Sequence, residues 1–164
     1  MVEALIALMI LAVLLAAIAL AVHASIASYQ ENDKIASVTQ SARFVLNRIV
    51  NDIRTAAAVD STSTKLTIIP PDDGSGLQQI QYEYDSSSHA LVYRRTVNGQ
   101  TTSHTLIGGG DEARLTVFYV LRETGTDWQG LPCTKSIKLR MGFTVDDNDF
   151  AVTASADPRR NQLY

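Results

Sequence analysis

Apolar residues fill the first 22 positions, MVEALIALMILAVLLAAIALAV, with Glu3 as the one exception. At ~1.5 Å per helical residue this stretch is about 33 Å long, which matches a hydrocarbon core of about 30 Å. A secretory signal has a basic start, a shorter apolar core and a small-residue cleavage site. This chain has no Lys or Arg before Lys34. We therefore expect a retained helix that is able to cross a bilayer.

After His23 the pattern becomes amphipathic, and no Gly or Pro occurs between Met1 and Ile69. Apolar residues recur at steps of three and four, which places them on one stripe of a helix. The stripe consists of Ile35, Val38, Ala42, Val45, Leu46, Ile49, Ile53 and Ala56. The pattern predicts one continuous helix of about 55–58 residues, whose first half lies in a membrane and whose second half covers a soluble core.

Beyond Asp60 the period changes from helical to alternating, which predicts β-strands. DSTST at residues 60–64 looks like a connector, and KLTII begins the sheet. QQIQYEY places Ile80, Tyr82 and Tyr84 on one face, as sheet core and cross-strand pairs. Asn98-Gly99 favours a two-residue type I′ hairpin turn. Later predictions are a face formed by Leu115, Val117, Tyr119 and Leu121 in RLTVFYVLRE, and a polar loop over residues 124–133.

These elements predict an α+β fold in which a long N-terminal helix packs on an antiparallel sheet. We expect residues 1–24 to form the membrane or filament-core half of the helix. Residues 25–164 form one globular domain, with helix at 25–58 and sheet at 64–157. A formal charge of −3 with scattered Lys and Arg argues against nucleic acid as a partner.

Candidate chemistry is sparse. Cys133 is the single cysteine, so an intramolecular disulfide and a CxxC site are excluded, and a free thiol or a thiol that joins two subunits remains. His23, His89 and His104 share no metal-ligand spacing. Asp146, Asp147 and Asp149 are weak candidates for calcium ligands, but the acidic run lacks the rest of a calcium loop, which favours a solvated hairpin turn. Neither a nucleophile elbow nor a phosphate loop occurs, so we expect no enzyme activity and no cofactor.

Glu3 has two interpretations from the residues alone. An acid inside a membrane is costly, roughly 2.5–3.5 kcal/mol near the centre, and therefore points to function. Alternatively, Glu3 lies in the headgroup region at the end of the helix. Physics alone does not separate the two.

The stretch MVEALIALMILAVLLA resembles the N-terminal region of the type IV pilin superfamily, whose motif is Gly-Phe-Thr-Leu-x-Glu. With Met1 in the place of the family's Leu, Glu3 falls on the family's glutamate. The family's Gly, Phe and Thr are missing, and of a trimmed sequence and a processed Met1 we favour trimming. ARFVLNRIVNDIRTA and FAVTASADPRRN are similar, over shorter motifs, to J-type minor pseudopilins and related minor pilins.

The resemblance implies a structural subunit of a type IV pilus or a type II secretion pseudopilus, with the minor subunit favoured over the major pilin. It implies maturation by a prepilin peptidase, N-methylation, and a single pass through the bacterial inner membrane before assembly with copies of itself or other pilin-like subunits. It also implies that Glu3 acts in assembly by pairing with a neighbour's terminal amine. A membrane-tethered extracytoplasmic binding or sensor module is the alternative, and a tethered enzyme would need a site that the sequence does not show.

Overall fold

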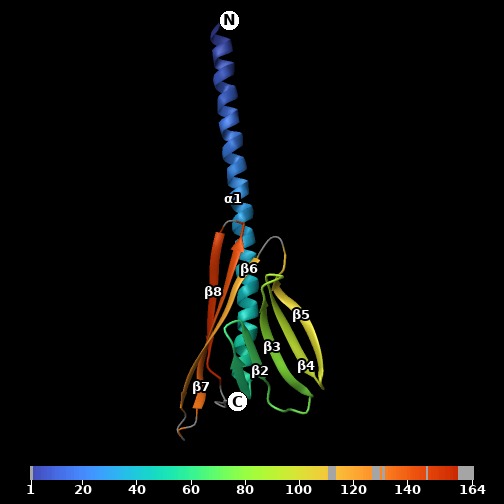
Figure 1. Cartoon of the computed structure of the whole chain (residues 1–164). Coiled ribbons are helices and arrows are strands. Elements are labelled where there is room, and N and C mark those ends of the chain that lie inside the picture. The colour runs from blue at the N-terminus through green and yellow to red at the C-terminus, as the bar shows by residue number, and fades with distance from the viewer. Residues whose placement is uncertain (1, 111–113, 127–129, 131, 147, 159–164) are drawn as a thin grey trace. The chain divides into compact units, whose positions relative to one another are not determined.

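The computed structural model describes residues 2–110, 114–126, 130, 132–146 and 148–158. They form one helix and eight strands in two antiparallel sheets (Figure 1), which confirms the α+β prediction. By compactness the chain divides into two units, residues 1–37 and residues 38–164, and α1 contributes to both. The elements are α1 (Val2–Thr55), β1 (Ala58–Ser61), β2 (Lys65–Ile69), β3 (Leu77–Asp85), β4 (Ala90–Val97), β5 (Gln100–Gly108), β6 (Arg114–Thr126), β7 (Pro132–Val145) and β8 (Asn148–Ala156).

In the first unit, α1 is helical from Val2 and every described residue through Gln30 is exposed. The helix is long and apolar enough to cross a membrane, and none of its most apolar stretch is buried. Beyond its first turn, the helix pairs the backbone amides of this stretch with carbonyls four residues earlier, whereas its Leu, Ile, Val and Ala side chains are exposed. Such a surface is stable only in lipid or against other protein.

In the second unit, the predicted apolar stripe of α1 becomes the centre of the core. Ala42, Ile49 and Ile53 have no exposed surface, and Val45 and Leu46 are buried beside them. Residues from strands of both sheets belong to the same cluster, and Figure 1 shows strands of both sheets beside this half of α1. The helix ends at Thr55, three residues before the predicted end, because the Ala57 amide already donates to the Ile69 carbonyl of β2.

The larger sheet is a meander in the order β1-β2-β3-β4-β5. The prediction that the sheet begins at residue 64 is wrong, because β1 already pairs with β2, Ala58–Ser61 with Leu66–Ile69. Only residues 62–64 remain for the turn between the two strands. Backbone pairing does not require apolar side chains, so polar Asp60 and Ser61 sit in a strand at the sheet edge. The Asn98-Gly99 turn is confirmed, because both residues have the positive φ that type I′ requires, at 49° and 78°.

The smaller sheet, in the order β6-β7-β8, is separate from the first. A register shift between Leu115 and Val117 inserts one extra residue in β6. The bulge reverses the side-chain alternation, so the predicted single face over residues 115–121 is wrong beyond Leu115. Phe118 and Val120 join Leu115 in the core instead. Val117, Tyr119 and Leu121 form an exposed row on the opposite face.

Candidate functional site

The exposed apolar surface of the first unit is the most prominent feature with a functional meaning. Between Ala4 and Val22 the chain has no ionisable residue, and Glu3 lies in the first turn of α1. Glu3 is thus the single acid of this apolar stretch, and the Glu3 side chain is exposed.

A polar cluster in the second unit holds α1 to the larger sheet. The fully buried Tyr82 of β3 donates from its hydroxyl to Oδ2 of Asp52 at 2.5 Å. Burial, followed by this hydrogen bond to a carboxylate, raises the pKa of Tyr82 above its usual value. The Arg48 guanidinium lies 4.4 Å from the centre of the Tyr93 ring, and the rings of Tyr82 and Tyr93 are 5.4 Å apart.

We call these four residues, Arg48, Asp52, Tyr82 and Tyr93, the helix–sheet cluster. Their contacts hold α1 against β3 and β4, which is a structural role. The sequence predicted Tyr82, Tyr84, Tyr93 and Tyr119 as sheet core and cross-strand pairs without saying which of them pair, and the register places Tyr82 opposite Tyr93. Sequence reasoning missed Arg48 and Asp52. Their spacing of four residues puts them on one face of the helix and was the available signal.

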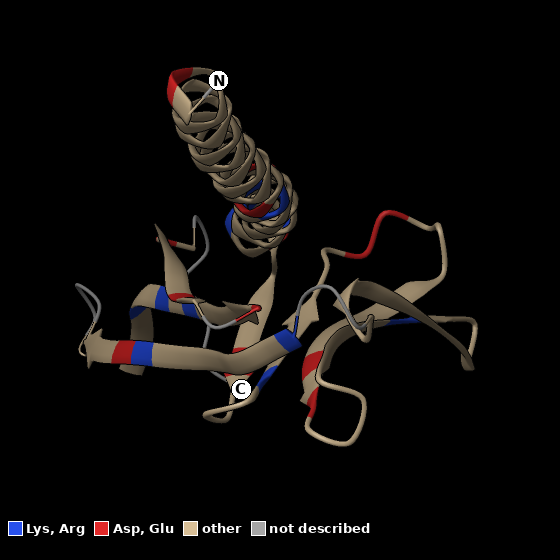
Figure 2. Ribbon diagram, turned by 90° about the horizontal axis from the view of Figure 1, so that it is seen from above, with Lys and Arg blue, Asp and Glu red and all other residues tan. Residues whose placement is uncertain are grey.

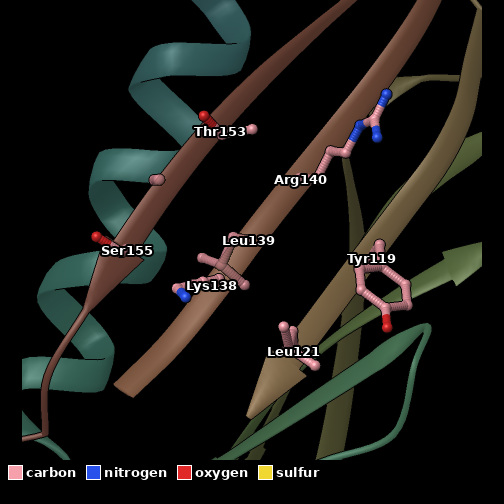
Figure 3. A pocket seen from close by; sticks show the side chains of 8 residues that line it. Tyr119, Leu121, Lys138, Leu139, Arg140, Thr153 and Ser155 are labelled. Carbon is pink, nitrogen blue, oxygen red and sulfur yellow. The ribbon is translucent and has the colours of Figure 1, made fainter. Parts of the chain in front are cut away.

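The outer face of the smaller sheet is hollowed (Figure 3). A depression of about 480 Å³ is lined by Tyr119 and Leu121 of β6, Lys138 and Arg140 of β7, and Thr153 and Ser155 of β8, among others. A second depression of about 300 Å³ is lined by Val117, Gly142 and Ala151, among others, and shares Arg140 with the first. We call this pair of depressions the outer groove. Sequence reasoning missed it because the β6 bulge leaves no signature in apolar periodicity.

The acidic run is a hairpin turn between β7 and β8, since Val145 pairs with Asn148. Asp146 has a φ of 50° and is exposed, as the turn requires. Asp149 accepts a hydrogen bond from the Thr144 hydroxyl at 2.5 Å. Asp147 lies outside the described residues. Within the part of the chain that the structure describes, no group of three His, Cys, Asp or Glu residues is placed to hold a metal ion.

The prediction of a polar loop over residues 124–133 is wrong at both ends, because β6 continues to Thr126 and β7 starts at Pro132. Cys133 therefore lies in a strand. The thiol is buried, with 2 % of the residue exposed. A disulfide to another subunit would therefore require this end of β7 to open.

Charges of both signs are scattered over the strands of the second unit (Figure 2). Arg122 pairs with Asp60 at 3.1 Å, Lys138 pairs with Glu123 at 2.5 Å, and Arg94 pairs with Glu83. These pairs leave no continuous basic stripe on the described strands.

No protein-family model, no curated protein sequence and no solved structure matches this chain significantly. What the chain itself shows is a long, apolar, N-terminal helix on an antiparallel β domain, an architecture compatible with a pilin-like fold.

Proposed function

We propose that this chain is a structural subunit of a type IV pilus or type II secretion pseudopilus, held in the bacterial inner membrane before assembly. The observation that carries the proposal is the uncovered apolar half of α1, which continues without a break into an amphipathic half that packs on a β domain. A plain membrane anchor has no need of an acid within its apolar stretch.

Glu3 gives the proposal a mechanism. In a filament core its carboxylate pairs with the positively charged terminal amine of a neighbouring subunit, which a prepilin peptidase exposes. Paired charges in a low-dielectric core cost far less than a lone one, and removal of one partner there typically costs ~3–5 kcal/mol. The pair selects correct addition of a subunit and sets its axial register. In this mechanism the chain is not an enzyme and needs no cofactor.

The subunit is either a minor subunit or the major pilin of the filament. The NDIRTA and DPRRN motifs favour a minor subunit of the J type. The outer groove, together with the exposed Asp72 and Asp73 in the connection between β2 and β3 of the larger sheet, favours a major pilin that contacts copies of itself. Counting copies of this chain per filament by quantitative mass spectrometry separates the two, because a major pilin makes up the bulk of the fibre.

The proposal is tested with Glu3→Ala and Glu3→Asp in cells that produce the filament. We expect the Ala variant to fold, to insert in the membrane and to be depleted from sheared filaments, with the Asp variant intermediate. Asp33→Ala, which removes an exposed acid outside the apolar stretch, is the matched control and enters filaments normally. Normal incorporation of Glu3→Ala contradicts the mechanism, and a chain that never enters filaments supports the tethered-module alternative.

A further inference from the structure

The outer face of the smaller sheet carries a row of apolar side chains that the core does not use. Val117, Tyr119 and Leu121 of β6 are 38 %, 43 % and 41 % exposed. Single exposed apolar residues are ordinary, whereas a continuous row beside a depression is typical of an interaction surface. The β6 bulge produces the row by turning these three residues outward.

The groove owes its depth to small residues in the middle and far strands. Gly142 of β7 lies opposite Val117, and a Cβ at Gly142 would lie 2.8 Å from Cγ1 of Val117. Ala151, Thr153 and Ser155 of β8 add only short side chains on the other side. The result is a groove with an apolar wall on β6 and a wall of short side chains on β8. Figure 3 shows Tyr119 and Leu121 on one side of its first depression and Thr153 and Ser155 on the other.

The charges in the groove select for a carboxylate. Lys138 is neutralised by Glu123, whose pKa is lowered by the hydrogen bonds from Lys138 and Ser136. Asp149 lines the second depression and accepts a hydrogen bond from the Thr144 hydroxyl, which leaves its negative charge in place. Arg140 lines both depressions, is exposed, and makes no ion pair with any described residue. The positive charge without an ion-pair partner therefore belongs to the first depression. A guanidinium next to apolar surface fits a segment that combines apolar groups with an acid.

The chain itself carries such a segment on its other sheet. The β2–β3 connection begins with Pro70 and Pro71 and continues with Asp72 and Asp73, of which Pro71 and both acids are exposed. Oδ1 of Asp72 accepts from the Gly74 amide at 3.2 Å, and Oδ1 of Asp73 accepts from the Ser75 amide at 2.9 Å. Prolines and these turns restrict the free loop, so binding it costs little conformational entropy.

We propose that the outer groove binds the residue 70–74 loop of a second copy of this chain, with Arg140 facing Asp72 and Asp73 and the prolines against Tyr119 and Leu121. The two partners come from different surfaces, so the contact is heterologous and can repeat from copy to copy. The inference rests on the proposed function, because α1 brings copies together, and two adjacent copies already satisfy it.

The test uses the full chain in the membranes of producing cells. A benzoylphenylalanine at position 119 is photoactivated, and cross-linked peptides are identified by mass spectrometry. We expect cross-links to residues 70–76 of a second copy, and none to that loop from the same probe at His104, an exposed position on β5. Cross-links that lead only to lipid, to the apolar half of α1 or to another protein overturn the proposal, as does an absence of cross-links.

Charge exchange makes the test specific. Arg140→Asp is expected to lower the cross-link yield about fivefold, which corresponds to ~1 kcal/mol for one exposed pair. Combining Arg140→Asp with Asp72→Arg and Asp73→Asn is expected to restore it, since Asn keeps the turn acceptor of Asp73 and removes its charge. Arg95→Asp, an equal charge change on the other sheet, leaves the yield unchanged, and near-ultraviolet circular dichroism confirms folding of each variant.

A yield that Arg140→Asp does not lower, or that the exchange does not restore, overturns the inference. Filament entry that depends on Glu3 without any loop–groove cross-link overturns the inference and leaves the proposed function intact. A loop–groove cross-link in a chain that never enters filaments supports the contact and contradicts the proposed function.

Discussion

Replacing Tyr82 with Phe removes one hydroxyl from the helix–sheet cluster and leaves the ring in place. The hydroxyl donates to Asp52 at 2.5 Å, and Tyr82 is fully buried. A hydrogen bond to a charged group contributes about 1.5–3 kcal/mol, and because Asp52 is only half-buried, water replaces part of it. We therefore expect Tyr82→Phe to lower the free energy of unfolding by about 1.5 kcal/mol, or the melting midpoint by about 5 °C.

The assay is urea or thermal unfolding of the full chain in non-ionic detergent, followed by the near-ultraviolet circular dichroism of the second unit's tyrosines. Tyr119→Phe is the matched control, because it removes an exposed hydroxyl for which the structure gives no hydrogen bond. A double-mutant cycle with Asp52→Ala isolates the pair. A loss below about 0.5 kcal/mol for Tyr82→Phe, or strict additivity in the cycle, refutes the reasoning.

Three further predictions follow from the same structure. Cutting the chain before about Glu31 should release a soluble fragment that keeps its β signal in circular dichroism, since core residues begin at Ala42; aggregation would show that the split lies elsewhere. Cys133 should react with a thiol reagent far more slowly in the folded chain than in urea, because it is buried, and rapid stoichiometric labelling of the native chain would contradict its burial. Hydrogen bonds from the hydroxyls of Ser87 and Ser88 and the Ser87 amide lower the pKa of Asp85 to about 2 from an ordinary 3.8. A lowered carboxyl pKa adds stability above 3.8 that is lost as the pH falls through 2, so carbon-detected NMR should place the Asp85 titration well below that of a Ser87→Ala, Ser88→Ala variant.

Patterns that depend on near neighbours in the chain were readable from the sequence. The absence of Gly and Pro and the three- and four-residue spacing predicted α1 and its apolar stripe. The structure confirms the helix and the stripe from Ala42 to Ile53, whereas Ile35 and Val38 are only half-buried. The Asn98-Gly99 turn follows from the conformational freedom of those two residues alone. Glu3, as the one acid at the start of the apolar stretch, was likewise evident without a structure. Its assembly role stays a prediction.

What only the tertiary structure decided depends on pairing between distant segments. The separation into two sheets, the pairing of β1 with β2 and the strand position of Cys133 arise from long-range backbone contacts that alternation does not encode. Asp52 meets Tyr82 only because α1 lies on β3. The outer groove follows from one extra residue in β6, since a strand has a period of two and a single bulge moves every later side chain to the opposite face.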